Sequence, residues 1–257
     1  MALRWATLIV VIISTAFNYL YLPFVFRSAG LDSNDHPYYL SPVEYGHGLG
    51  MLIPLCFLIY AMHQLLPQQQ SKILYDRLTG PVIFTSAFGI FRVVLADQDT
   101  PGLKVLATAM MTINAMVMLR LVRSRILDCS YSPWLTIPFS LNAGFLAVAI
   151  FADISLWLKG IGWYDYPPGE SAWTVLMIVA VFALAVSVSV KYKDWLYSIV
   201  LTYTIISIWW AKPENVAVNT ATLFVGMVLA IWSAGYAAYC IREQITSTGG
   251  MEEIENI

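Results

Sequence analysis

Charged residues are scarce in this chain, and the common patterns of catalysis and metal binding are missing. Only 12% of its 257 residues are charged, whereas soluble domains average about 25%. A net charge of −2 gives no attraction for nucleic acid. The three cysteines lie far apart, so the sequence predicts neither a disulfide framework nor a zinc site. No Ser/His/Asp cluster, HExxH motif or glycine-rich phosphate loop occurs, and we therefore predict that the protein is not an enzyme.

Long apolar stretches are what the chain has in place of these patterns. Each is long enough to cross the hydrocarbon core of a bilayer. The predicted spans are residues 2–24, 46–66, 80–97, 102–122, 133–158, 172–191, 194–211 and 214–241. Their connections are short, so we predict an all-α fold: a polytopic transmembrane helix bundle of about eight spans that forms a single domain over residues 1–241. Residues 242–257 are polar and acidic, and we predict that they form a flexible C-terminal tail.

The basic residues predict the orientation of this bundle. If both termini lie on one side, that side holds nine Lys and Arg residues and the opposite side holds four. This asymmetry favours cytoplasmic termini, in a bacterial plasma membrane or an internal membrane, with membrane lipid as a partner. The larger set is Arg4, Lys72, Arg77, Arg120, Arg123, Arg125, Lys191, Lys193 and Arg242. The smaller set is Arg27, Lys104, Lys159 and Lys212.

Two predicted outer loops are rich in aromatic residues and proline. They are residues 27–45, RSAGLDSNDHPYYLSPVEY, and residues 159–171, KGIGWYDYPPGES. Two roles are open for them. Either they cap a cavity together, or they only anchor the bundle at the level of the lipid headgroups.

Arg92 lies well inside the third predicted span. A guanidinium in hydrocarbon costs at least about 2.5 kcal/mol, so Arg92 should face protein, water or an acidic partner. Thr85, Gly89 and Ala96 share its helix face at spacings of three or four residues. This stripe is small and polar, which predicts close contact with a neighbouring helix.

Asp153 lies inside the fifth predicted span and is opposite in sign to Arg92. Its helix face also carries Asn142 and Trp157. We predict that Arg92 and Asp153 approach each other or share a cavity. Three interpretations are open: a structural pair that fixes helix packing, a pocket lining that contacts a polar or anionic ligand, or an Arg92 side chain that reaches the interface by itself.

Two histidines lie in the second predicted span. His47 and His63 are sixteen residues apart, and neither has a second ligand one helical turn away, so no metal site is predicted. A single histidine can ligate a haem or chlorophyll. Lone histidines in apolar helices, however, are more often hydrogen-bonded packing residues, and this is the interpretation that we favour.

The fifth predicted span resembles a segment of a known family. Residues 137–154, IPFSLNAGFLAVAIFADI, are similar to the PFSLYLGWITVATIANI segment of the tryptophan-rich sensory proteins, the TspO/MBR-like membrane proteins. Residues 160–163 and 173–177 are similar to the continuation found in the longer bacterial branch, which has about eight transmembrane helices. Residues 40–45, LSPVEY, resemble the TPAGY entrance to the second helix. The resemblance covers about residues 1–235 and identifies a divergent member.

This resemblance implies a helix bundle with a cavity open toward one leaflet, and ligands such as tetrapyrroles, sterols or other lipids. Pro42 and Tyr45 match the entrance to the second helix. The matches in the fifth-helix motif are Pro138, Phe139, Gly144, Phe145 and Asp153.

The departures from the family pattern fall on the residues that shape its pocket. Phe145 stands where the family has tryptophan, and Asp153 stands where it has asparagine. Gly89, Ile90 and Arg92 occupy the region of the third-helix asparagine and tryptophan. Either the pocket is retuned, or the fold serves as a scaffold.

Our leading hypothesis is a TspO-like protein that binds a hydrophobic ligand in an intramembrane cavity: a tetrapyrrole (haem, porphyrin or chlorophyll), a carotenoid or a lipid. The predicted ligand-binding residues are Arg92, Asp153, Asn142, Phe145, Trp157, Pro42, Tyr45 and His47. The alternative is an accessory structural subunit of a larger pigment-bearing or redox membrane complex, or of a homo-oligomer. A third hypothesis is small-molecule transport, with Arg92 and Asp153 on a water-accessible path.

Overall fold

The computed structural model describes residues 2–20, 44–69, 71–96, 100–127, 131–163, 169–211 and 215–255. Within these ranges there are eight α-helices, two short 3-10 helices and no strand. The α-helices are α1 (Ala2–Leu20), α3 (Glu44–His63), α4 (Ile73–Ala96), α5 (Pro101–Leu127), α6 (Ile137–Gly160), α7 (Gly169–Tyr192), α8 (Trp195–Ala211) and α9 (Val216–Glu255). The 3-10 helices are η1 (Pro67–Gln69) and η2 (Pro133–Thr136).

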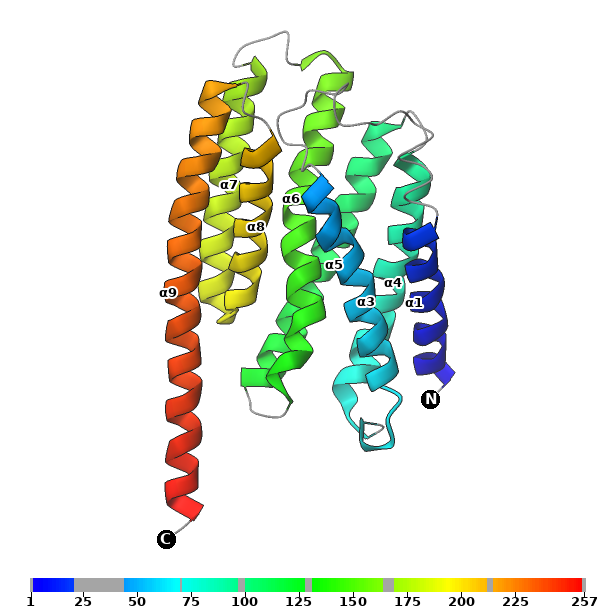
Figure 1. Ribbon diagram of the computed structural model, residues 1–257. Coiled ribbons are helices and arrows are strands. Elements are labelled where there is room, and N and C mark those ends of the chain that lie inside the picture. The colour runs from blue at the N-terminus through cyan, green and yellow to red at the C-terminus, as the bar shows by residue number, and fades with distance from the viewer. Residues whose placement is uncertain are drawn as a thin grey trace.

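The apolar helices confirm the predicted all-α polytopic fold. Six of them are long and apolar enough to cross a membrane, and α3 and α8 contain shorter apolar stretches over residues 48–63 and 195–210. Eight spans are therefore consistent with the helices that the structure describes. Figure 1 shows that the helices run up and down beside one another and that both chain ends lie at the same end of the bundle. We call this the terminal end, and the opposite one, where α4 ends and α5 begins, the distal end.

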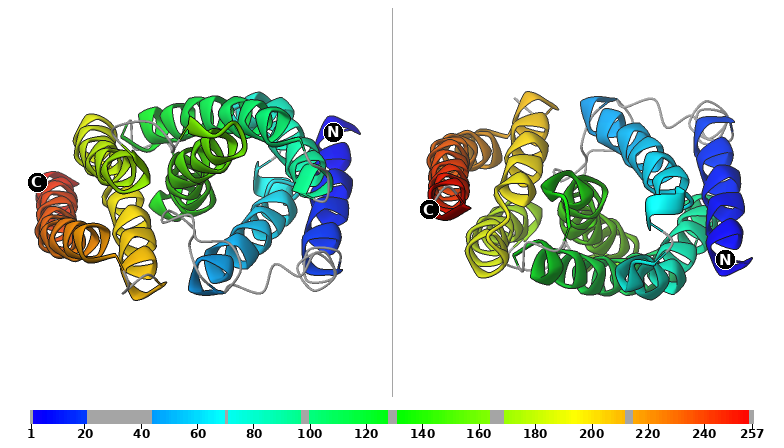
Figure 2. Two further views of the ribbon diagram at one scale, coloured as in Figure 1. Left: turned by 90° about the horizontal axis from the view of Figure 1, so that it is seen from above. Right: turned by 90° about the horizontal axis from the view of Figure 1, so that it is seen from below.

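Seen along their axes, the helices form two groups with α6 between them (Figure 2). The first group contains α1, α3, α4 and α5, and the second contains α7, α8 and α9. Helix α6 packs against α5 and α3 on one side and against α8 on the other. In the apolar stretch that includes α6, 72% of the residues are buried, against at most 39% in each of the other long spans. Helix α6 is therefore the central helix of the core.

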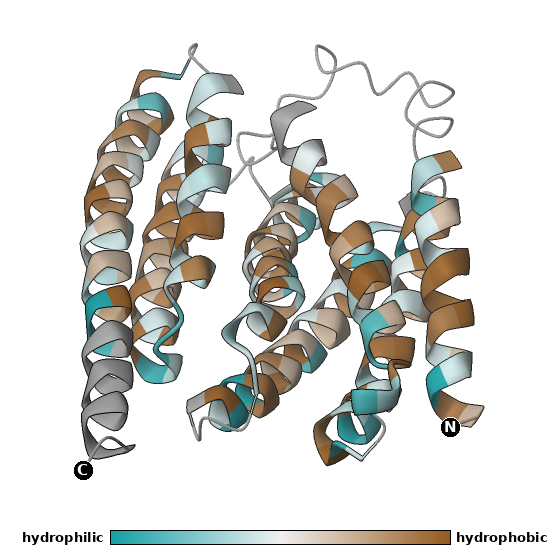
Figure 3. Cartoon of the chain, turned by 60° about the horizontal axis from the view of Figure 1, so that its bottom comes forward, coloured by the Kyte–Doolittle hydropathy of each residue, from teal (hydrophilic) through white to brown (hydrophobic). Residues whose placement is uncertain are grey.

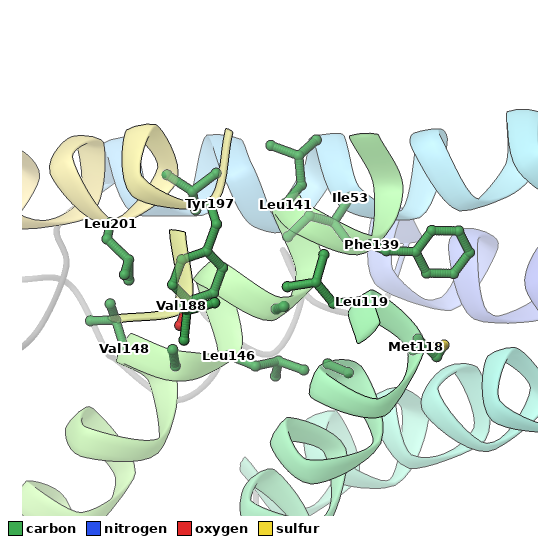
Figure 4. Packing of buried hydrophobic residues seen from close by; sticks show 14 of the residues in the cluster. Ile53, Met118, Leu119, Phe139, Leu141, Leu146, Val148, Val188, Tyr197 and Leu201 are labelled. Atoms are coloured by element: carbon green, nitrogen blue, oxygen red, sulfur yellow. The ribbon is translucent and has the colours of Figure 1, made fainter. Parts of the chain in front are cut away.

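The family motif on α6 contributes to this core (Figure 4). The Phe139 ring packs edge-to-face against Phe57 and Tyr60, with centroid distances of 5.6 and 5.1 Å. Gly144 lies at a close contact between α6 and α8: a Cβ added at this position would be 2.8 Å from Cγ1 of Val200. Only glycine avoids that overlap. Phe139 and Gly144 thus have packing roles in the bundle.

Hydrophobic residues recur along the helices (Figure 3), and many large apolar side chains among them are exposed. Ile9 on α1, Ile113 on α5 and Ile231 on α9 are all more than half exposed. Large apolar side chains left open on helices throughout the bundle fit a chain whose solvent is lipid.

Arg4 joins the start of α1 to the connection between α3 and α4. Its side chain is 2% exposed. Nε donates to Oδ1 of Asp76 at 2.8 Å, and Nη1 donates to the carbonyls of Gln64 and Gln69 at 3.2 and 2.9 Å. This contact lies on the first turn of α4, which begins at Ile73 rather than at residue 80 as the hydropathy predicted. The apolar span thus includes this turn, and Asp76 is the acidic residue in it that binds Arg4.

The turn between α7 and α8 is fixed to the other helix group by buried polar contacts. Arg123 on α5 donates to the carbonyls of Tyr192 and Lys193. Asp194 accepts from the amides of Leu196 and Tyr197 at 3.1 and 3.4 Å and so caps α8. Ser140 on α6 donates to the same carboxylate. Burial raises the pKa of Asp194 above its ordinary value, outweighing these hydrogen bonds.

Helix α9 is longer than its apolar stretch. Its backbone is helical as far as Glu255, so the residues from 242 onward, predicted to form a tail, begin inside this helix. Their flexibility stays a prediction, as does the division into a domain over 1–241 and a tail.

Candidate functional site

Arg92 on α4 and Asp153 on α6 form an ion pair, which confirms the predicted approach of these two residues. Nη2 of Arg92 donates to Oδ2 of Asp153 at 3.2 Å and to Oδ1 at 3.4 Å, and Nε donates to Oδ2 at 3.3 Å. The Asp153 side chain is 5% exposed and that of Arg92 is 25% exposed. The carboxylate is therefore enclosed by helices, while the guanidinium stays partly accessible.

Two residues of α5 complete what we call the ion cluster: Arg92, Lys104, Thr108 and Asp153. The hydroxyl of Thr108, a fully buried residue, accepts from Nε of Arg92 at 2.9 Å and donates to Oδ2 of Asp153 at 2.6 Å. Nζ of Lys104 lies 3.3 Å from Oδ1 of the same carboxylate. Three helices thus meet at one carboxylate.

Amide and hydroxyl side chains join these three helices by hydrogen bonds. Asn114 on α5 donates to Oγ1 of Thr85 at 2.7 Å and to the carbonyl of Pro81 at 2.8 Å, which ties α5 to α4. Thr112 donates to the carbonyl of Leu146 at 3.3 Å, which ties α5 to α6. The stripe that contains Thr85 and Arg92 therefore contacts α5, as its small residues predicted.

The formal charge of the ion cluster is +1, because two cations share one carboxylate. Lys104 lies at the fourth residue of α5, where the positive end of the helix dipole already disfavours a cation. Counted over the described residues, this point of the distal end therefore carries a surplus positive charge. In surroundings of low dielectric constant such a surplus attracts anions strongly.

Trp157 is the predicted site residue that lies beside the ion cluster. It follows Asp153 by one turn of α6, and it is 39% exposed. A Cβ added at Gly102 would lie 3.5 Å from Nε1 of Trp157, so the indole stands against the first turn of α5. An accessible aromatic surface thus adjoins the charged groups.

Two further predicted residues on α6 lie away from the ion cluster. Asn142 precedes Asp153 by eleven residues, which is about 16 Å along a helix. It is 4% exposed, and its Nδ2 has no hydrogen-bond partner among the described residues. Phe145 points toward α3, where a Cβ added at Gly50 would lie 3.9 Å from its Cζ. These two residues belong to the interior of the bundle.

The remaining predicted residues come from the segment before and at the start of α3. Pro42 lies outside the described residues, as does most of the predicted outer loop 27–45. Tyr45 and His47 lie in the first turns of α3 at the distal end, but their side chains are outside the described part. Their ligand-binding roles stay predictions.

His63, at the other end of α3, is a packing residue. The sequence favours this role because no second metal ligand lies one helical turn away. Its Nδ1 lies 3.0 Å from the Tyr75 hydroxyl. Its ring packs edge-to-face against Trp134 at 4.6 Å. In the parts of the chain that the structure describes, no group of three His, Cys, Asp or Glu residues converges on a point that would hold a metal ion.

The sequence prediction missed Lys104 and Thr108. From the sequence, Lys104 is only one of the four basic residues on the side opposite the termini. The signal that links the two is their spacing: Lys104, Thr108 and Thr112 follow each other at intervals of four residues, so they lie on one face of α5.

Comparison with known proteins places this fold in a family. Residues 4–235 match the family described as TSPO-like protein. No curated protein and no solved structure matches the chain. Because the match covers most of the chain, this multi-pass helical membrane protein belongs to the TSPO-like family.

Proposed function

We propose that the chain binds a hydrophobic ligand in an intramembrane cavity and holds the polar end of that ligand at the ion cluster. The observation that carries the proposal is the surplus positive charge of Arg92 and Lys104 over Asp153, in a bundle that exposes many large apolar side chains. A structural ion pair needs one cation for one anion. A second cation that remains 19% exposed suits a partner from outside the chain.

The neighbouring Trp157 supports the same proposal. An indole that is partly exposed next to a cationic group presents an apolar face and a hydrogen-bond donor together. Of the ligands expected for the family, tetrapyrroles and lipids combine an apolar body with a polar end in this way. A carotenoid would use only the apolar part of the site.

Purification from a native membrane in mild detergent tests the proposal. We expect an apolar compound to co-purify, to be identified by visible absorption and mass spectrometry, and to rebind the stripped protein with quenching of tryptophan fluorescence. Arg92→Met should weaken rebinding while Lys104 and Thr108 still satisfy Asp153, so the fold is retained. Arg77→Gln, an exposed change at the terminal end, is the matched control. If no porphyrin, carotenoid or lipid binds the wild type more tightly than Arg92→Met, the proposal is wrong.

A second candidate function is that of an accessory subunit, and the length of α9 favours it. A helix of 40 residues is about 60 Å long, roughly twice the hydrocarbon thickness of a bilayer. Figure 1 shows α9 continuing past the other helices at the terminal end, where it is open to a partner. Truncation after residue 242 should then release the protein from a larger complex in native electrophoresis. Unchanged migration would remove this candidate.

A further inference from the structure

We infer that the ligand carries a single negative charge, a carboxylate, and that this group binds Lys104 together with Arg92 while Asp153 stays in place as a built-in counterion. This inference rests on the proposed function and names the chemical class of the ligand. The ion cluster holds its two cations unequally.

Arg92 is held more firmly than Lys104. Its guanidinium makes three contacts with Asp153 and one with Thr108, through Nε and Nη2. The ammonium group of Lys104 has Asp153 as its one partner among the described residues, at 3.3 Å. Lys104 thus keeps most of its three donors for another acceptor.

The donors that are left over lie on the accessible side of the ion cluster. Nη1 of Arg92 donates to none of the described residues, and the Arg92 side chain is 25% exposed. Lys104 is 19% exposed, whereas Thr108 is fully buried. An acid group that arrives from the distal end therefore meets the two cations first. The inner side of Asp153 remains bonded to Thr108.

Charge balance sets the valence of that acid group. With one added carboxylate the ion cluster has two positive and two negative charges and is neutral. A phosphate monoester carries about −1.5 to −2 at neutral pH and would overbalance the cations. A neutral headgroup would leave the surplus charge in place. An amphiphile with one carboxylate fits best.

The test compares ligands that differ only in the headgroup. Parinaric acid, a fluorescent polyene fatty acid, its methyl ester and an alkyl phosphate of similar length are titrated into the protein in detergent micelles. We expect the wild type to prefer the acid over the ester by about tenfold, the ratio that a moderate ion pair gives. Lys104→Gln should remove this preference by weakening the binding of the acid. Lys104→Arg should restore it.

A matched control and a second variant complete the test. Lys159→Gln, an exposed change near the end of α6, should preserve the preference for the acid. Asp153→Asn, where it folds, should bind the acid more tightly because the surplus becomes +2. Equal affinity for acid and ester in the wild type would overturn the inference while the proposed function stands. A tenfold preference for the alkyl phosphate over the acid would overturn the inference that the ligand carries a single negative charge. If neither acid nor ester binds, the proposed function itself fails.

Discussion

At the scale of single residues, Thr108 determines how the ion cluster is held together. The hydroxyl groups of many described threonines form a hydrogen bond within their own helix. Those of Thr79 and Thr174, for example, donate to the carbonyl four residues earlier. Thr108 donates instead to Asp153 and accepts from Arg92. Its hydroxyl thus sets the orientation of both charged groups.

Thr108→Val should destabilise the protein by about 1.5–3 kcal/mol, the usual range for hydrogen bonds to charged groups. Valine keeps the shape of threonine but leaves Nε of Arg92 and Oδ2 of Asp153 with one partner fewer. Thermal unfolding in detergent measures the loss. Thr108→Ser retains the hydroxyl and serves as the control. Equal unfolding midpoints for the valine and serine variants would contradict this role.

The residues of the ion cluster were predictable from the sequence only in part. Arg92 and Asp153 were found because a charge in an apolar span is costly and needs a partner. Thr108 gives no such signal, because a helical threonine usually needs no partner beyond its own helix. Lys104 looks like an ordinary interfacial lysine until the fold brings α6 beside it.

At the scale of helices, the contact between α6 and α8 depends on Gly144. Gly144→Ala would place a Cβ 2.8 Å from Cγ1 of Val200 and 3.4 Å from the carbonyl oxygen of Tyr197. We expect a loss of about 1–3 kcal/mol from overpacking, measured as a lower unfolding midpoint. Gly80→Ala on α4 is the control, because nothing lies within 4 Å of its Cβ position. That change should be neutral or slightly stabilising. Equal effects of the two substitutions would contradict the predicted close contact.

The turn between α7 and α8 gives a prediction for pH. Burial raises the pKa of Asp194, so its carboxyl group binds a proton more tightly in the folded chain than in the unfolded chain. The contribution of Asp194 is then greatest at acid pH and is lost as the pH rises through its folded pKa. Measured relative to Asp194→Asn, the stability of the wild type should be greater at about pH 4 than at about pH 7. A difference in unfolding midpoint that does not change with pH would count against this.

The boundaries of the helices could be predicted from the sequence only in part. Hydropathy located each apolar stretch but not every residue at which a helix begins or ends. The first turn of α4 binds Arg4 through Asp76, and the capping carboxylate of α8 bonds to Ser140 on α6. These polar residues form contacts between helices. Their roles therefore cannot be predicted until the position of the neighbouring helix is known.

At the scale of the whole molecule, the arrangement of the bundle allows a direct test of its orientation. The ion cluster lies at the distal end, one or two turns from the ends of α4 and α6, and cytoplasmic termini would place it toward the outer leaflet. In a cysteine-free chain expressed in bacteria, Lys159→Cys at the distal end should react with a membrane-impermeant maleimide in intact cells. Arg125→Cys near the terminal end of α5 should react only after permeabilisation. The reverse pattern would put the termini outside the cytoplasm and turn the ion cluster toward the inner leaflet, so its acid ligand would then have to arrive from the cytoplasmic side.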